Sequence, residues 1–131
     1  MRVARILVGA FCLSLATSHA NAENATKTMA AGTVLKMGAY MNLNEDCSSI
    51  GYADVRIVTA PTHGTVKVYK GTWHPNFASS NPRAACNLHK APSVNVDYTP
   101  ERGYLGSDFV SIEVIFPNGV DRTDNITINV K

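Results

Sequence analysis

The sequence predicts an all-β sandwich of about seven short antiparallel strands, tied by one disulfide. Apolar and polar residues alternate in most segments, turn residues interrupt these segments at short intervals, and no segment has the periodicity of an amphipathic helix. The clearest case is the stretch from Val94 to Phe116, in which two alternating runs flank a turn-rich centre. Because that centre is too long for a two-residue hairpin, we expect it to cross from one sheet to the other.

The first 22 residues have the pattern of a cleaved export signal. A basic start with Arg2 and Arg5 precedes an apolar run at 6–16, and an Ala-Asn-Ala triplet at 20–22 offers small residues for cleavage. The apolar run is too short to span a bilayer alone. Cleavage after the triplet leaves 109 residues, the size of a single domain. We therefore expect a periplasmic or secreted protein that does not insert into the membrane.

The charge balance gives no reason to expect a polyanionic partner. The whole chain has a formal net charge of +2, but Arg2 and Arg5 leave with the signal. Ten basic and ten acidic residues remain, so the mature chain is formally neutral with its histidines uncharged. Binding to nucleic acid or to an anionic membrane usually requires a clear basic excess. We expect no nucleic-acid partner.

The mature chain keeps two cysteines, Cys47 and Cys86, because Cys12 lies in the export signal. A cysteine pair in a small exported domain is expected to form one structural disulfide. A redox or metal-binding pair would usually have a much shorter spacing. Closing a loop of this length should stabilise the fold by about 3–4 kcal/mol.

In the first half of the chain, strands are expected within a domain that spans residues 32–131. The segment 23–31 is short, polar and rich in alanine, and we expect it to be a flexible mature N-terminus. Residues 33–43 predict two short strands with a bulge or kink at Gly38. A further strand is expected at 52–59, where valine and isoleucine alternate with polar residues.

The second half contains the longest irregular segment of the sequence. After a strand at 65–69, residues 70–93 show no clear periodicity and predict a long loop, which Cys86 pins to the turn at Cys47. After the central stretch, a Pro-Asn-Gly turn at 117–119 reverses the chain. The last strand is expected at 125–130.

Five residues are expected to shape the crossing inside the central stretch. Pro100 fixes its own φ where the chain leaves a strand, and Gly103 and Gly106 permit conformations that other residues resist. Tyr104 can bury its ring at the end of the sandwich. Asp108 can accept hydrogen bonds from nearby backbone amides and so hold the turn.

Three motifs give the chain a resemblance to bacterial immunoglobulin-like and cadherin-like repeat modules. Residues 60–66, Ala-Pro-Thr-His-Gly-Thr-Val, resemble the P-x-x-G-x-V hairpin of these modules. Residues 98–108 look like their Y-x-P crossing with its G-x-D ending, and residues 126–130 are similar to their closing strand. The resemblance implies an immunoglobulin-like β-sandwich, here as a single exported domain. It implies little about function, because such modules serve adhesion, enzyme spacing and surface architecture alike.

The chain departs from these modules in two places. They often carry aromatic residues where this chain has Val110 and Ile112, which keep the core apolar but make it smaller. Their link after the P-x-x-G hairpin is normally short, whereas this chain carries the loop 70–93. Because the sequence contains one such module, we do not expect it to act as a spacer in a repeat array.

The loop 70–93 is the predicted binding site. It holds Trp73, the one tryptophan of the chain, together with His74, Phe77 and His89. Loops on a rigid sandwich commonly carry specificity, and exposed aromatic rings can grip a sugar or the side chains of a partner. The sequence therefore predicts an exported, non-catalytic binding or scaffolding module that contacts a protein or glycan of the cell envelope. The alternative is that Trp73 and Phe77 only cover the open end of a small core.

Two other functions stay open. The first is a small metal-handling protein or enzyme that uses His74 and His89, which share the loop. No local ligand spacing supports a metal site, and no Gly-x-Ser-x-Gly elbow supports catalysis, so we expect no metal, no cofactor and no enzymatic activity. The second is a purely structural component of the envelope.

Overall fold

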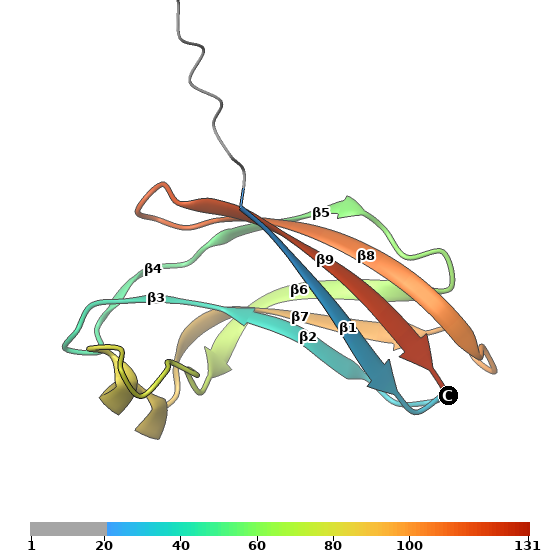
Figure 1. Cartoon of the computed structure of the whole chain (residues 1–131), viewed down its shortest axis with the longest axis horizontal. Helices are drawn as coiled ribbons and strands as arrows, with labels where there is room; N and C mark the ends of the chain where they lie inside the picture. The colour runs from blue at the N-terminus through green and yellow to red at the C-terminus, as the bar shows by residue number, and fades with distance from the viewer. Residues whose placement is uncertain (1–20) are drawn as a thin grey trace, which may run out of the picture.

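The computed structural model describes residues 21–131 and consists mainly of two β-sheets packed face to face (Figure 1). One sheet has the order β1-β9-β8-β5, the other has the order β2-β7-β6, and β3 and β4 form a small separate pair. The strands are β1 (Asn21–Met29), β2 (Leu35–Tyr40), β3 (Asn42–Leu43), β4 (Ser49–Gly51), β5 (Asp54–Thr59), β6 (Gly64–Trp73), β7 (Ala91–Pro100), β8 (Gly106–Ile115) and β9 (Asp121–Val130). Among the described residues, no helix is long and apolar enough to cross a membrane.

The strand order confirms the predicted fold class. If the seven long strands are lettered A to G along the chain, the two sheets read A-G-F-C and B-E-D. This is the order of an immunoglobulin-like sandwich in which the first strand lies beside the last one. The chain passes between the sheets after β7, as the central stretch predicts. Membership of the repeat-module family stays a prediction.

The prediction of a flexible N-terminus at residues 23–31 is wrong. Residues up to Met29 form β1, which pairs with β9 in parallel from Asn21 beside Arg122 to Met29 beside Val130. The sequence does not reveal this strand, because among residues 22–29 Met29 alone is buried and no apolar alternation results. The position of β1 depends instead on backbone pairing with the edge of β9. The strands are therefore not all antiparallel. The predicted signal, 1–22, lies outside the described residues except for its last two, which begin β1.

The predicted loop at 70–93 is also too long. β6 continues to Trp73 and β7 begins at Ala91, with paired residues from Lys70 beside Val94 to Trp73 beside Ala91. The irregular segment that remains is 74–90, which contains the short 3₁₀ helix η1 (Ala84–Leu88). The prediction failed because β7 is buried on both faces at its start, where polar residues interrupt the alternation: Ser93 and Asn95 are buried, and the Ser93 hydroxyl donates to Asn95 Oδ1.

Two core clusters stabilise the fold. The main core lies between the sheets, and its fully buried residues include Val96, Tyr98, Val110, Ile112 and Val114, which the sequence places on the inner faces. A smaller core lies under the segment 74–90 and contains the buried residues Leu43, Cys86 and Ala91, with Met41, Cys47 and Phe77 packed against it.

Two local predictions are confirmed. The pairing of β2 with β7 shifts register between Lys36 and Gly38, which is the bulge that the glycine indicated. The reversal at 117–119 joins β8 to β9, and the Gly119 N–H donates to the Phe116 carbonyl over 2.9 Å. Gly119 has a φ of 83°, a conformation that favours glycine.

The crossing between β7 and β8 is held by Asp108. Its carboxylate accepts hydrogen bonds from the backbone N–H groups of Thr62 and His63, each over 3.0 Å, and from the Tyr98 hydroxyl over 2.7 Å. It also accepts from the N–H of Phe109 over 2.9 Å. The predicted role of Asp108 is therefore confirmed, and the carboxylate links the 60–66 hairpin to the Tyr98 strand.

Glycine and tyrosine complete this end of the sandwich. A Cβ at Gly64 would lie 2.4 Å from the Tyr98 ring, so only glycine lets the ring pack there. Gly103 and Gly106 have φ values of 79° and 136°, as their predicted roles require. Tyr104 is half-buried rather than buried, and its hydroxyl donates to the Ser107 carbonyl over 2.6 Å. Pro100 is the last residue of β7 and is buried.

Candidate binding groove at the loop-bearing end

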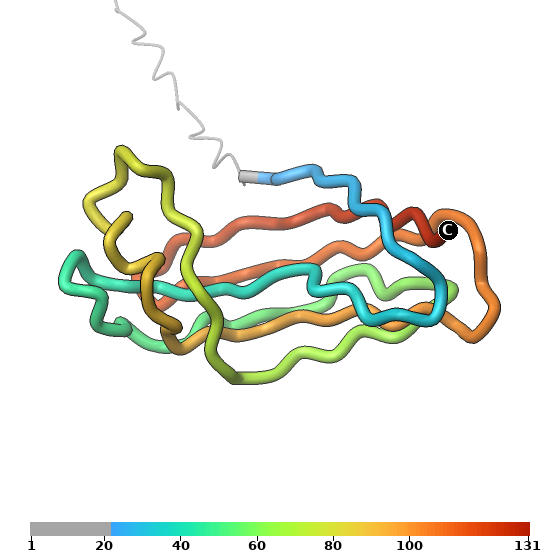
Figure 2. Tube along the Cα trace, turned by 90° about the horizontal axis from the view of Figure 1, so that it is seen from below, coloured from blue at the N-terminus to red at the C-terminus, as the bar shows by residue number. Residues whose placement is uncertain are grey.

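Three connections meet at the end of the sandwich opposite the crossing. These are the β3–β4 turn, the segment 74–90 and the β8–β9 turn, and both ribbon views place them together (Figures 1 and 2). The corresponding end of an antibody variable domain carries the antigen-binding loops, because the strands hold such loops without taking part in binding.

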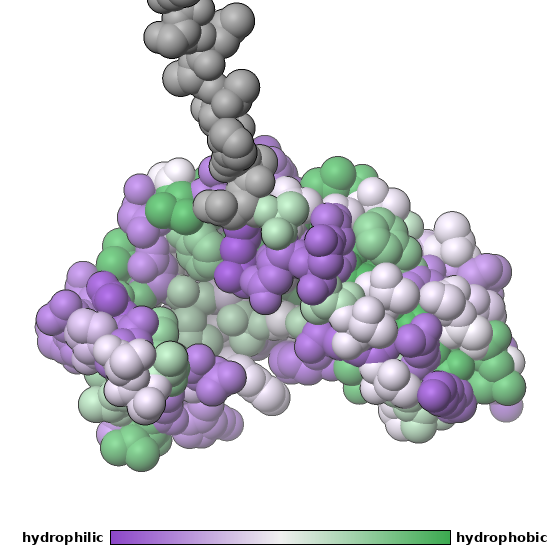
Figure 3. Space-filling view, viewed as in Figure 1, coloured by the Kyte–Doolittle hydropathy of each residue, from purple (hydrophilic) through white to green (hydrophobic). Residues whose placement is uncertain are grey.

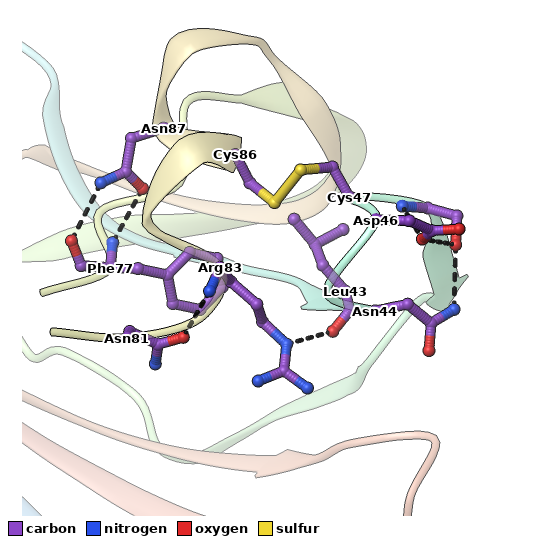
Figure 4. The surroundings of a disulfide bond; sticks show 10 residues. Leu43, Asn44, Asp46, Cys47, Phe77, Asn81, Arg83, Cys86 and Asn87 are labelled. Atoms are coloured by element: carbon purple, nitrogen blue, oxygen red, sulfur yellow. Dashed lines mark hydrogen bonds between the residues drawn. A yellow bond between two sulfur atoms is a disulfide. The ribbon is translucent and has the colours of Figure 1, made fainter. Parts of the chain in front are cut away.

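The predicted disulfide is confirmed and joins two of these connections. Cys47 lies in the β3–β4 turn and Cys86 in η1, 39 residues later, with an S–S distance of 2.04 Å (Figure 4). Cys47 has a φ of 69°, which is uncommon for a residue other than glycine. The turn around Cys47 is closed by the Asn44 N–H, which donates to the Ser48 carbonyl, and by the Cys47 N–H, which donates to the Asn44 carbonyl.

Side chains also fix the segment 74–90. The Asn87 amide pairs with the backbone of Phe77 in both directions, accepting from its N–H and donating to its carbonyl, each over 2.9 Å. Arg83 Nε donates to the Leu43 carbonyl over 2.6 Å. His74 Nδ1 lies 3.2 Å from the Asn87 carbonyl oxygen. The segment is therefore ordered by contacts of its own, which reduces the entropy that binding would cost.

A groove of about 350 Å³ lies between this segment and the edges of the two sheets. The hollow is visible in the space-filling view, between the segment 74–90 and the body of the sandwich (Figure 3). We call it the aromatic groove, and its lining residues are Ala39, Tyr40, Met41, Trp73, His74, Pro75, Asn76, Phe77, Phe116 and Arg122.

A fixed arginine sits in the aromatic groove. The Arg122 guanidinium pairs with Asp124, Nε to Oδ1 at 3.1 Å, and a terminal nitrogen lies 3.6 Å from a Glu23 carboxylate oxygen. The guanidinium also lies over the rings of Tyr40 and Phe116, at 5.5 Å and 5.9 Å from their centroids. Arg122 is thus held by charge and by aromatic contact together.

Tyr40 and Asp124 form a buried hydrogen bond beneath Arg122. The Tyr40 hydroxyl donates to Asp124 Oδ2 over 2.7 Å. Burial raises the pKa of Tyr40 well above its usual range, and the hydrogen bond to Asp124 adds to the effect. The tyrosine therefore keeps its proton at any physiological pH and acts as a donor that orients the carboxylate.

Trp73 and Phe77 line the same groove but have different surroundings. Trp73 is 45% exposed, and the Lys36 ammonium lies 4.7 Å from the centroid of its ring. Phe77 is half-buried and belongs to the small core around Cys86. The sequence offered two interpretations for both residues, and the structure separates them: Phe77 is a packing residue that also forms a wall, whereas Trp73 presents its ring to solvent.

The remaining predicted contact residues divide in the same way. His74 lies in the groove with Trp73 and Phe77, but His89 is exposed and lies outside the lining of the groove. Within residues 21–131, no three histidine, cysteine, aspartate or glutamate side chains come close enough to hold a metal ion. The structure therefore does not bring His74 and His89 together into a metal site.

Sequence reasoning missed the five lining residues of the aromatic groove that lie outside the predicted loop: Ala39, Tyr40, Met41, Phe116 and Arg122. Arg122 and Asp124 occupy the same face of β9 as the buried Ile126 and Ile128. Two charged residues that continue an inward-facing apolar row are a readable signal, because buried charges are usually paired and often functional.

The comparisons with known proteins do not assign a family. No family model matches the chain, and no curated protein is similar in sequence. Among solved structures, the chain is similar to the solution structure of amebosin, with 13% identity and a TM-score of 0.38 over 83% of this chain and 98% of that one. A similarity at this level carries no argument about fold or function.

Proposed function

We propose that the protein is an exported, non-catalytic binding module that receives its partner in the aromatic groove. The observation that carries this proposal is the exposed ring of Trp73 at a groove whose other walls are fixed by the disulfide, by Asn87 and by Asp124. An exposed tryptophan at the rim of a rigid concave site is the type of residue that dominates binding energy in interfaces. Export remains part of the proposal and rests on the signal pattern.

The composition of the groove favours binding over catalysis. Among the described residues, the lining contains no serine, threonine, cysteine or carboxylate that could act as a nucleophile beside His74. Arg122 is already paired with Asp124, so its charge orients groups rather than transfers protons. A groove of this kind offers aromatic faces and fixed donors, which suit recognition of a protein segment or a glycan.

The test compares two substitutions at the same end of the sandwich. Trp73→Ala removes the exposed ring of the groove, and Leu88→Ala removes a side chain that is 76% exposed but does not line the groove. Both variants and the wild type are applied to an array of synthetic peptides and to an array of oligosaccharides. We expect the ligands of the wild type to be kept by Leu88→Ala and to be weakened at least about tenfold by Trp73→Ala.

Two results would contradict the proposal. If Leu88→Ala and Trp73→Ala weaken binding equally, the groove is not the site. If neither array yields a ligand of the folded wild type, a purely structural role in the envelope becomes the better account.

A further inference from the structure

Two arginines at the loop-bearing end differ in their partners. Arg122 is paired with Asp124 and approaches Glu23. Arg83 is half-buried and donates through Nε to the Leu43 carbonyl, but no carboxylate among residues 21–131 lies within 4.0 Å of its guanidinium. Figure 4 shows its two terminal nitrogens pointing away from the disulfide. A guanidinium that is fixed at one nitrogen and open at the other two is prepared for a bidentate partner.

A pocket of about 260 Å³ surrounds this guanidinium. Its lining combines apolar side chains with amides: Met41, Asn42, Leu43, Phe77, Arg83 and Asn118. We call it the arginine pocket. Met41 and Phe77 also line the aromatic groove, so the two sites are neighbours that share a wall.

A second polar group in the arginine pocket lacks a partner. The Asn42 Nδ2 group is buried, and within residues 21–131 it has no hydrogen-bond acceptor. An unsatisfied buried donor destabilises the fold, so native proteins rarely keep one without a reason. Arg83 adds a positive charge to the lining of the same pocket, and this charge favours an acceptor that carries negative charge.

We propose that the arginine pocket binds a carboxylate of an acidic peptide segment, whose neighbouring apolar residue occupies the aromatic groove. This inference rests on the proposed function, since it names the ligand class of the same end of the molecule. The carboxylate can come from an Asp or Glu side chain or from the C-terminus of the peptide, because both present the same two oxygens to the Arg83 guanidinium.

A peptide fits these surroundings better than a glycan does. The aromatic groove reaches the end of β2 at Ala39 and Tyr40, and β2 is an edge strand that pairs with β7 on one side only. An edge strand offers backbone donors and acceptors to an extended peptide. Met41 and Phe77 form the wall that the arginine pocket shares with the aromatic groove, so a peptide whose carboxylate lies at Arg83 can place its neighbouring apolar side chain against the other side of that wall.

The experiment is a double-mutant cycle between protein and peptide. The probe is the tightest acidic peptide found on a synthetic array of ten-residue peptides, compared with versions in which each Glu or Asp is replaced by Gln or Asn and with a C-terminally amidated version. The protein variants are Arg83→Gln and the matched control Arg102→Gln, an exposed arginine at the opposite end of the sandwich. Dissociation constants are measured by fluorescence anisotropy at two salt concentrations.

We expect one carboxylate of the peptide to contribute at least about tenfold to affinity in the wild type and in Arg102→Gln. In Arg83→Gln the same peptide change should have no further effect, because its partner has gone. Which peptide version loses affinity identifies the source of the carboxylate, a side chain or the C-terminus.

Because Arg83→Gln also loses the bond to the Leu43 carbonyl, a second variant controls for folding. Asn42→Asp has the same shape as the wild type and adds a carboxylate to the lining of the arginine pocket. We expect this variant to keep its melting temperature. Its affinity for the acidic peptide should fall at least about tenfold, because the new carboxylate competes with the peptide carboxylate for the Arg83 guanidinium.

The outcomes separate this inference from the proposed function. If peptide binding depends on Trp73 but not on Arg83 or on any carboxylate of the peptide, the aromatic groove remains the binding site. The arginine pocket is then not a carboxylate site. An acidic oligosaccharide, such as an oligogalacturonate, that binds in an Arg83-dependent way while no peptide does would overturn the peptide assignment. Binding that is lost equally in Arg102→Gln would overturn both.

Discussion

The two ends of the sandwich are closed by different chemistry. At the crossing end, the Asp108 carboxylate accepts hydrogen bonds from Thr62, His63, Tyr98 and Phe109, so the buried charge is satisfied on every side. At the loop-bearing end, a disulfide and a small apolar core do the closing; within residues 21–131 the buried Asn42 Nδ2 group has no acceptor and the Arg83 guanidinium has no carboxylate partner. A satisfied end stabilises the fold, and an end with unpaired donors and an exposed tryptophan is where a ligand can gain energy.

The largest expected effect tests whether Asp108 closes the crossing end. Asp108→Asn turns a fourfold acceptor into a group with one acceptor oxygen, which leaves buried donors unpaired. We expect the free energy of unfolding to fall by about 4 kcal/mol, measured by urea denaturation, since several charge-assisted hydrogen bonds are lost at once. Asp121→Asn, an exposed carboxylate in β9, is the control and should change it by less than about 0.5 kcal/mol.

The same variant should change how stability depends on pH. Burial raises the pKa of Asp108, but hydrogen bonds from Tyr98 and from the amides of Phe109, Thr62 and His63 outweigh it, so the pKa lies below its ordinary value. A lowered pKa in the folded state stabilises the fold above the unfolded value of about 3.8, and this contribution is lost as the pH falls further. In Asp108→Asn, the free energy of unfolding should fall less steeply than in the wild type as the pH drops below about 4. If both proteins lose stability equally over this range, the role of the carboxylate is refuted.

The second effect tests the loop-bearing end. The double variant Cys47→Ala and Cys86→Ala opens the disulfide without leaving a free thiol. We expect a loss of about 3 kcal/mol, because the closed loop of 39 residues no longer restricts the unfolded chain. The two ends should respond separately: limited proteolysis should cut within 74–90, while hydrogen exchange in β8 and β9 stays slow in the folded fraction. If exchange accelerates equally in β8, the two ends are one cooperative unit.

The crossing end was readable from the sequence, and the physical reason is local. Gly64, Tyr98 and Asp108 each occur in a short motif whose role depends on few neighbours, and the structure brings these motifs into direct contact. The period-two pattern also placed Val110, Ile112 and Val114 in the core. The disulfide followed from having two cysteines in a small exported domain.

The loop-bearing end was only partly readable, because it depends on contacts between distant segments. β1 has a polar sequence and takes its place from the open edge of β9, which no local pattern records. Ser93 and Asn95 interrupt the alternation of β7, so the first residues of this strand were assigned to a loop. Trp73, His74 and Phe77 were chosen correctly as neighbours, but Tyr40 comes from β2 and Phe116 from the residue after β8, and they join the others only in the folded chain.

The smallest expected effects compare Phe77 with Trp73 within the aromatic groove. Phe77→Ala removes a half-buried ring from the small core, and we expect it to cost about 2 kcal/mol. Trp73→Ala removes a ring that is 45% exposed, and its main packing loss is the contact with the Lys36 ammonium. Such a contact is worth about 0.5–1 kcal/mol at an exposed site, so the melting temperature should fall by only a few degrees.

Thermal unfolding of both single variants, together with protease sensitivity of the segment 74–90, measures this difference. Phe77→Ala should expose the segment to protease. The Asn87 amide still bonds the backbone of residue 77, but the ring that anchors the segment in the small core is gone. Trp73→Ala should leave the segment protected and change binding alone. If Trp73→Ala is as destabilising as Phe77→Ala, the tryptophan is a packing residue, and the distinction between a stabilising wall and a recognition residue in this groove does not hold.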